Sequence, residues 1–429
     1  MPTRVGIIHE DRLAGMWLTP EVISFSGSLL ACWLLVRTGQ LHGHLTHDLT
    51  DGAQKIHEGA VPRIGGIGLA SGLILGGATL GHGAALWWIF ALGALPAFAA
   101  GLWEDLTKTV PVRVRLTATI AAGVLFAEVT GYSLHHLDLW PIDSIIGLPV
   151  VAIGFTGLAI GGVANAMNII DGCNGLAGGT GLILLAAMGC ISAVEHDYAL
   201  VSLILLTMAG VMGFLLINFP HGRIFLGDAG AYALGFLVAA FAIALPARHA
   251  DVSPAIGLLV VIYPVSETLY SVVRRLSKAR TAVSQPDRLH LHSLTFEALK
   301  GRIDNPVFRN SLSSVFIWAL PLLSALMSFA LAWSSVTVVL LAAAANVLLY
   351  RLAYAQVLRL THHPRAPRGK AFNAALMPAP MPSLEIVAAE DSYSGRRTNA
   401  KRDRHPSRPN VRYVPLALSK ASLWLGQLR

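Results

Sequence analysis

The chain has 429 residues, of which 54% are hydrophobic and only 13% are charged. Soluble domains carry about 25% charged residues, so this composition excludes an ordinary soluble enzyme and a disordered protein. The three cysteines have neither paired spacing nor a metal-binding pattern, so no disulfide framework is expected. The net charge is +8, but the residues from Arg351 onward carry +10 and the preceding 350 carry −2.

Eleven apolar stretches approach the roughly 20 residues that an α-helix needs to cross a bilayer. They lie at about 19–37, 64–81, 84–102, 114–131, 145–164, 175–194, 198–218, 230–247, 255–273, 311–331 and 334–354. The sequence therefore predicts an all-α polytopic membrane protein with about eleven transmembrane helices over residues 19–355. Residues 1–18 form a short N-terminus, and residues 356–429 form a basic, mostly disordered tail that contacts lipid headgroups.

Lys and Arg alternate between successive loops, as the positive-inside rule expects. The loops after the first, third, seventh and ninth stretches are basic, whereas those after the even-numbered stretches hold only Arg248. This asymmetry predicts that the N-terminus is outside and that the tail and the odd-numbered loops are cytoplasmic. The first apolar run lacks a small-residue cleavage pattern, so no cleavable signal peptide is expected.

Acidic side chains stand at predicted cytoplasmic ends of the apolar stretches. A carboxylate at the bilayer centre costs about 2.5–3.5 kcal/mol, so acids close to the spans are expected to have a specific role. Glu104 and Asp105 end the third stretch, beside Lys108. They could hold a cation, accept a proton or form a surface ion pair. The acids of the outside loops, such as Glu195 and Asp197, show no pattern and are expected to be solvated loop charges.

Two further segments combine acids with amides. The loop after the fifth stretch carries four such residues, Asn165, Asn168, Asp171 and Asn174. Asp228 directly precedes the eighth stretch. Carboxylate and amide oxygens are ligands for hard cations such as Mg²⁺, but the same side chains also cap helix ends. The residues alone leave both interpretations open.

Two segments are basic or glycine-rich. Arg288, His290 and His292 lie in a strongly basic cytoplasmic loop, where they could bind phosphates. Basic residues there are also what orientation requires, and the other ligands of a zinc site are missing. The segment His57 to Gly66 opens the second stretch, and its glycine pair would let two helices approach closely.

The order and the amino-acid sequences of these five segments resemble those of the polyprenyl-phosphate N-acetylhexosamine-1-phosphate transferases, or glycosyltransferase family 4. The resemblance covers about residues 20–355. The segment 165–176 is similar to the family's Asn-Ala-x-Asn-x-x-Asp-Gly-x-Asp-Gly-Leu signature. Glu104-Asp105 stands where the family has an Asp-Asp pair, and Phe225 to Gly230 resembles its Phe-Met-Gly-Asp-x-Gly motif. The segments 57–66 and 287–292 resemble its first cytoplasmic motif and its histidine loop.

The resemblance implies that a UDP-linked N-acetylamino-sugar 1-phosphate, with GlcNAc-1-phosphate favoured, is transferred to a polyprenyl (undecaprenyl) phosphate. UMP is released, and a cell-envelope polysaccharide such as O-antigen is begun at the cytoplasmic face of the bacterial inner membrane. The implied cofactor is Mg²⁺, with Mn²⁺ as an alternative, and the implied partners are the two substrates and membrane lipids rather than nucleic acid. A homodimer is left open.

The resemblance also assigns roles by position. The Mg²⁺ ligands would be Asp228 and Asn168. The catalytic acids would be Glu104, Asp105 and Asp171. The nucleotide sugar would be bound by Asn165, Asn174, Arg288, His290 and His292. Contacts to the lipid phosphate would come from Lys55 and Lys108.

The chain departs from the family pattern at several of these positions. Glu104 replaces the first Asp of the pair, Asn174 replaces the second Asp of the signature, and Ser293 replaces a third histidine. These changes affect substrate detail and the catalytic base more than the reaction class. A dedicated base is not required, because a phosphate monoester with a second pKa near 6 is already largely dianionic at neutral pH.

Two rival functions remain. A transporter would need acids near the middle of a span or broken helices, and Glu267 with nearby Pro264 is the main candidate. A homologue that binds sugar nucleotide or lipid phosphate without turnover is the other. The sequence leaves open the acetamido sugar, the lipid length and the pathway.

Overall fold

The protein is described from a computed structural model, and the description covers residues 19–48, 61–81, 83–277 and 289–362. These residues belong to one unit, residues 1–367. Lys55, Arg288 and most of the predicted tail lie outside the described residues.

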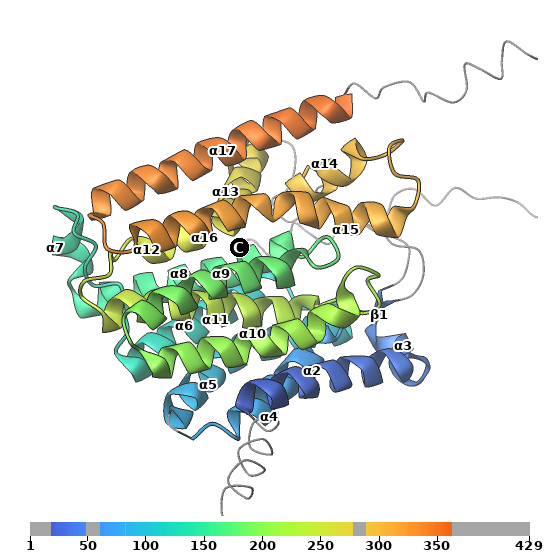
Figure 1. Cartoon of the computed structure of the whole chain (residues 1–429), viewed down its shortest axis with the longest axis horizontal. Coiled ribbons are helices and arrows are strands. Elements are labelled where there is room, and N and C mark those ends of the chain that lie inside the picture. Colours follow the sequence, from blue (N-terminus) through green and yellow to red (C-terminus); the bar gives the residue numbers. More distant parts are fainter. Residues whose placement is uncertain (1–18, 49–60, 82, 278–288, 363–429) are drawn as a thin grey trace, which may run out of the picture. The chain divides into compact units, whose positions relative to one another are not determined.

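Nearly all the described residues form helices (Figure 1). In chain order these are α2 (Pro20–Arg37), α3 (Gly39–Thr46), α4 (Gly65–Gly77), α5 (Ala84–Thr107), α6 (Val112–Thr130), α7 (Ile142–Ile146), α8 (Pro149–Ile170), α9 (Leu176–Val194), α10 (Tyr198–Asn218), α11 (Gly227–Arg248), α12 (Ile256–Val260), α13 (Ile262–Ser277), α14 (Leu291–Ala298), α15 (Pro306–Ile317), α16 (Ala319–Leu331) and α17 (Val336–His362). Two short strands, β1 (His47–Asp48) and β2 (Val61–Pro62), pair antiparallel.

The predicted all-α polytopic membrane fold is confirmed, because each of the eleven apolar stretches is occupied by helix. Eight helical segments of the described residues are long and apolar enough to cross a membrane. Among the other stretches, α4 has only 13 residues, and α6 carries Arg113, Arg115 and Glu128. The number of spans and the side that each loop faces therefore stay predictions.

Several expected helices have other bounds, and the stretch 311–331, for example, is divided into α15 and α16 at Trp318. The stretch 255–273 is divided into α12 and α13 because Val261 leaves helical geometry, with φ −89° and ψ 12°. The last helix, α17, continues to His362, past the predicted boundary at residue 355. The break in the ninth stretch turns the chain so that Glu267 of α13 faces other helices; its exposure is 1%.

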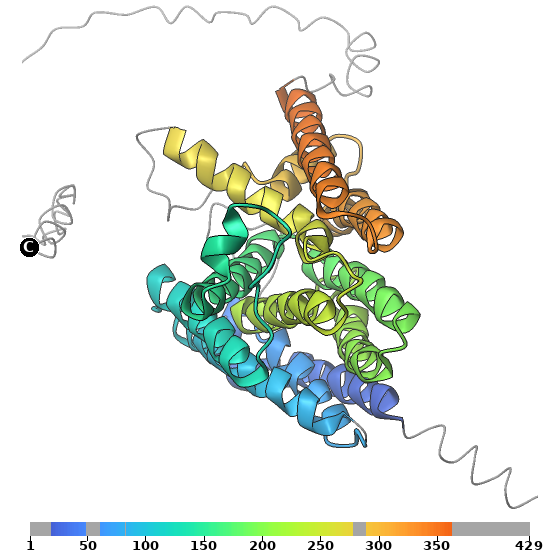
Figure 2. The same cartoon turned by 90° about the vertical axis from the view of Figure 1, so that its left-hand side faces the viewer.

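Helix α11 lies in the middle of the bundle. Of its span, 89% is buried, and it contacts α4, α5, α6, α8, α9 and α12. In Figure 2, which views the helices largely end-on, the yellow-green α11 has blue-to-teal helices on one side and green helices on the other. A helix that is apolar all round is expected in such a position.

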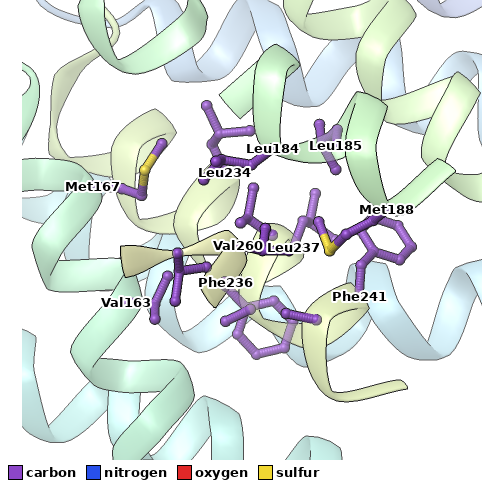
Figure 3. Close-up of a cluster of buried hydrophobic side chains, with 14 of the residues drawn as sticks. Val163, Met167, Leu184, Leu185, Met188, Leu234, Phe236, Leu237, Phe241 and Val260 are labelled. Atoms are coloured by element: carbon purple, nitrogen blue, oxygen red, sulfur yellow. The ribbon is translucent and has the colours of Figure 1, made fainter. Parts of the chain in front are cut away.

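Large apolar side chains fill the space between α11 and its neighbours α8, α9 and α12 (Figure 3). The buried side chains labelled there are Val163, Met167, Leu184, Leu185, Met188, Leu234, Phe236, Leu237, Phe241 and Val260. At the start of α11 the packing changes, because small residues bring the backbones together. A Cβ atom on Gly66 of α4 would stand 2.4 Å from the backbone nitrogen of Gly230, so α4 and α11 touch through their main chains.

The far end of the bundle, opposite the start of α11, carries a second polar cluster. Asp197 is 8% exposed and accepts hydrogen bonds from Arg248 and from the Leu200 N–H, with His249 Nε2 at 3.0 Å. The expectation that Asp197 is a solvated loop charge is therefore wrong. It is an ion-paired helix cap that joins the start of α10 to the end of α11.

Candidate active site

The predicted site segments meet at one end of the helix bundle. β2, the end of α5, the start of α6, the end of α8 and the start of α11 converge there, and α14 and the start of α15 lie at the same right-hand end in Figure 1. The Nδ2 atom of Asn168 lies 3.0 Å from Oδ1 of Asp228 although 60 residues separate them. The two acid-and-amide segments therefore share one end, which the site hypothesis requires.

Asp105 caps the first turn of α11. Its exposure is 2%, and its two carboxylate oxygens accept the backbone N–H groups of Asp228 and Ala229, each at 2.9 Å. Gly227 has φ +74°, and a Cβ there would stand 2.6 Å from the Asp105 carboxylate, so glycine is needed for this approach. Helix N-termini leave such N–H groups unsatisfied and attract negative charge. Asp105 thus fixes the position of Asp228.

Asp228 is the centre of the site, and its exposure is 4%. Asn168 of α8 donates to its Oδ1 atom at 3.0 Å, and Arg63, between β2 and α4, donates to the same oxygen at 3.0 Å. Arg115, in the first turn of α6, pairs with Oδ2. One carboxylate of α11 therefore draws together groups from three other parts of the chain.

Sequence reasoning did not predict Arg63 and Arg115 as site residues. Arg63 lies within the segment that resembles the family's first motif, directly before Gly65-Gly66, and this was its one signal. Arg115 was interpreted as part of the basic loop that sets orientation. Their guanidinium groups are partly buried, with side-chain exposures of 34% and 16%. They bring positive charge to the place where an anionic substrate would have to lie.

The chemistry of Asp228 and Asn168 fits the predicted Mg²⁺ ligands, a carboxylate oxygen and an amide oxygen. Within the described residues no three His, Cys, Asp or Glu side chains are grouped so that they could hold a metal ion alone. Mg²⁺ in proteins is commonly bound by one or two carboxylates while substrate phosphates supply other ligands. The donor set therefore fits an ion that arrives with a diphosphate.

The loop between α8 and α9 contains Asp171, the C-cap of α8. Burial raises the pKa of the Asp171 carboxyl to about 7; the positive charge of Arg63 opposes this shift and the negative charge of Asp228 adds to it. A carboxyl with a pKa near neutrality can hold or release a proton at physiological pH. This is the property that a candidate acid or base requires.

Asn174 is the loop's anchor. Its side chain donates to the carbonyl oxygen of Pro220 at 3.0 Å, and its backbone N–H donates to Oδ1 of Asn310 at 2.6 Å. Its exposure is 6%. An amide can donate to a carbonyl oxygen whereas a carboxylate cannot, which explains why this chain tolerates Asn at a position where the family has Asp.

His290 and His292 stack in parallel, with ring centroids 5.4 Å apart and an angle of 1° between the rings. Each is 7% exposed. His292 lies against Gly172, because a Cβ on that glycine would stand 2.1 Å from its Nε2 atom. Burial, with a smaller contribution from His290, lowers the pKa of His292 to about 4. The predicted histidine loop thus reaches the loop that contains Asp171.

The remaining predicted residues surround this centre. Asn165 donates to Thr119 Oγ1 at 2.8 Å, and Glu104 accepts the Val110 N–H at 2.8 Å. Lys108 ends α5 in left-handed geometry, with φ 56°. These contacts join α5, α6 and α8 beside the Asp228 cluster, and none of them assigns a substrate role.

An apolar cavity of about 550 Å³ extends along α8, α11 and α13. Its lining includes Val163 and Ala166 of α8 and Thr268 and Leu269 of α13. At the far end it is lined by Leu137. The cavity thus provides an apolar space along two helices, α8 and α11, whose other ends contribute Asn168 and Asp228 to the site.

The all-helical fold and the charged cluster at the end of its helices define the class: a polytopic membrane protein with a site suited to anions. Residues 87–246 match glycosyl transferase family 4, so the predicted resemblance to this family is confirmed. The match includes Asp105, Arg115, Asn168 and Asp228.

Three relatives illustrate the similarity. The chain is 25% identical to a probable undecaprenyl-phosphate N-acetylglucosaminyl 1-phosphate transferase of Bacillus subtilis, over 56% of this chain and 66% of the relative. It is 30% identical to a phospho-N-acetylmuramoyl-pentapeptide-transferase of Lactococcus lactis, over 38% and 50%. It is 28% identical to a decaprenyl-phosphate N-acetylglucosaminephosphotransferase of Mycolicibacterium smegmatis, over 65% and 74%. The chain covers about half to two thirds of the first two relatives.

Proposed function

We propose that the protein transfers an N-acetylhexosamine 1-phosphate from a UDP-sugar to a polyprenyl phosphate, with GlcNAc as the favoured sugar and undecaprenyl phosphate as the favoured acceptor. Two observations support this proposal: the activities that the names of the relatives give, and the convergence of Asn168, Arg63 and Arg115 on Asp228. That convergence is the observation that carries it, because a diphosphate transfer must neutralise negative charge where two phosphates meet.

In the proposed reaction an oxygen of the lipid phosphate attacks the β-phosphorus of the UDP-sugar. A new P–O bond forms, the bond between the β-phosphorus and the bridging oxygen of the diphosphate breaks, and UMP leaves with that oxygen. Mg²⁺ held by Asp228 and Asn168 would offset the charge on the transferring phosphate. Arg63 and Arg115 lie at the same carboxylate and would contact the phosphate oxygens as these enter.

Asp105 and Asp171 divide the acid roles. Both oxygens of Asp105 are occupied by N–H groups of α11, which supports a role in holding Asp228 in place. Asp171, whose pKa burial raises to about 7, is better suited to exchange a proton with substrate. Glu104, Lys108 and Lys55 remain candidates for the lipid phosphate, and Asn165, Arg288, His290 and His292 for the sugar nucleotide.

The apolar cavity supports the acceptor assignment. It runs along α8 as far as Ala166 and along α13 as far as Leu269, so an isoprenoid chain in it would point its phosphate toward the end of α8 that carries Asn168. A water-soluble acceptor would have no use for an apolar lining. The proposed enzyme acts in the bacterial inner membrane with this end facing the cytoplasm, and it begins an envelope polysaccharide.

The test is release of UMP by the purified full-length chain supplied with Mg²⁺, undecaprenyl phosphate and a panel of UDP-sugars. Asp228→Ala and Asp228→Asn should each abolish release, because the pairing of two arginines and the metal ligand is lost. The matched control is Asp251→Ala, which removes an exposed acid beyond the other end of α11 and should leave turnover unchanged.

Three results would refute the proposal or its site. If UDP binds but no UDP-sugar yields UMP, the protein is a binding homologue without turnover. If a UDP-sugar crosses the bilayer of liposomes that contain the protein, and is recovered intact, the protein is a transporter. Release of UMP at the wild-type rate by Asp228→Asn would show that the Asp228 cluster is not the active site.

A further inference from the structure

Glu267 is a carboxylate buried where the sequence predicts a membrane span. It lies on α13, and its exposure is 1%. Burying a charged group is costly unless it is paired and hydrogen-bonded. Glu267 is therefore expected to have hydrogen-bond partners that offset the free-energy cost of its burial. The identity of these partners indicates its role.

Three donors converge on Glu267 from two other helical elements. His290 Nδ1 lies 3.0 Å from Oε1, and the backbone N–H of Leu291 donates to the same oxygen at 3.1 Å. The hydroxyl of Tyr350 on α17 donates to Oε2 at 2.9 Å. Because adjacent residues 290 and 291 share one oxygen, the carboxylate holds both the imidazole and the first turn of α14.

The carboxylate also fixes which nitrogen of His290 is available. An ionised carboxylate only accepts hydrogen bonds, so His290 Nδ1 is a donor to Glu267 and Nε2 is the nitrogen left for another partner. The ring is further held by its parallel stack on His292, which in turn lies against Gly172. Glu267 is thus the far end of a chain of contacts that leads to the Asp171 loop.

A purely structural role for Glu267 would not require its contact with His290. Tyr350 and the Leu291 N–H could tie α13 to α17 and α14 without an imidazole, and α14 could begin with any residue at position 290. In the structure the strongest acceptor of this region instead faces a side chain of the predicted substrate site. Carboxylates that bind the back of a histidine commonly fix its ring orientation and its tautomer.

We propose that Glu267 is a positioning residue that orients His290, so that its Nε2 atom binds the diphosphate of the donor. This inference rests on the proposed function, in which His290 contacts the sugar nucleotide. It removes Glu267 from the transporter hypothesis, because its partners belong to the histidine loop and to α17.

The experiment is a double-mutant cycle on nucleotide binding, with purified full-length chain, UDP and Mg²⁺ in isothermal titration calorimetry. Glu267→Gln and His290→Ala should each weaken UDP binding by about tenfold. The double variant should bind no more weakly than His290→Ala alone, because Glu267 acts through that ring. In turnover assays, Glu267→Gln should raise the KM for the UDP-sugar and leave the KM for the lipid unchanged.

Tyr263→Phe is the matched control. It changes α13 one turn before Glu267 and removes a buried hydroxyl that has no hydrogen-bond partner within the described residues. It should leave UDP binding unchanged in both backgrounds. Tyr350→Phe keeps the carboxylate and both contacts to residues 290 and 291, so it provides a milder variant if Glu267→Gln does not fold.

The outcomes separate this inference from the proposed function. If Glu267→Gln weakens UDP binding by the same factor with and without His290, the residue acts through the fold and the inference is wrong. If the coupling is found but wild-type protein releases no UMP, only the proposed function fails. If UDP does not bind to wild-type protein, both fail.

Discussion

The contact between Asp105 and the start of α11 makes a sharp prediction for Asp105→Asn. The two carboxylate oxygens accept two backbone N–H groups at 2.9 Å, whereas an Asn side chain offers one acceptor and turns its NH₂ group toward the other N–H. The loss is one charge-assisted hydrogen bond, whose N–H stays buried without an acceptor, at about 1.5–3 kcal/mol.

Two smaller effects also change the free energy of unfolding of this variant. The favourable interaction of a negative charge with the helix N-terminus is lost, at about 0.3–1 kcal/mol. Repulsion between Asp105 and Asp228 is relieved, which offsets part of the cost, and Arg63, 4.0 Å from Asp105, already screens it. The free energy of unfolding should therefore fall by about 3 kcal/mol, which corresponds to a fall in Tm of about 5 °C for a large domain.

The assay is thermal unfolding in detergent, followed by tryptophan fluorescence, together with UMP release below the transition. Asp105→Asn should lose turnover as well as stability, because Asp228 is no longer held. Glu104→Gln is the matched control: Glu104 accepts one N–H from Val110, so about 1 kcal/mol is at stake. If Asp105→Asn unfolds within about 1 °C of the wild type, Asp105 is not the cap of α11 that its contacts indicate.

Two further changes probe other contacts. Gly172→Ala should displace the ring of His292, which lies 2.1 Å from the added Cβ, and should therefore weaken UDP binding. Gly154→Ala on α8, where a Cβ meets nothing within 4 Å, should leave UDP binding unchanged. Equal UDP affinities of the two variants in calorimetry would contradict this prediction. Burial alone would raise the pKa of Asp197, but its hydrogen bonds, that from Arg248 foremost, lower it, so Asp197→Asn should destabilise the protein by about 2 kcal/mol near pH 7. The difference in unfolding free energy should shrink as pH falls below about 4, where the aspartate of the unfolded chain is protonated, and a difference that grew on acidification would refute the assignment.

The positions of the helices could be predicted because each is written in a continuous apolar run. The runs 19–37 and 198–218, for example, coincide with α2 and α10 within a residue. The break between α12 and α13 has a local signal in Pro264, which has no N–H to donate to the carbonyl oxygen of Val260 and whose ring crowds that carbonyl. Hydropathy alone does not show the break, because the sequence around Val261 stays apolar.

The acids of the site could be predicted, but their partners could not. Asp228 and Asn168 carry a signal because a polar residue at the end of a span needs a reason. Arg115 carries none, since a basic residue at the cytoplasmic end of a span is what orientation demands. Its contact with Asp228 depends on α6 lying beside α11, and hydropathy does not report which helices are neighbours. The same limit concealed the contact of Glu267 with His290.

The central position of α11 has a consequence for biogenesis. The helices around it at the active end, α4, α5, α6 and α8, all precede it in the chain, so during synthesis they enter the membrane before the helix that they will enclose. The carboxylate of Asp228 can pair with the guanidinium groups of Arg63 and Arg115 only when α11 arrives. A chain interrupted before residue 227 would therefore hold Asp105 and Arg115 without their shared counterpart, and such a nascent fragment should be a ready substrate for membrane quality-control proteases.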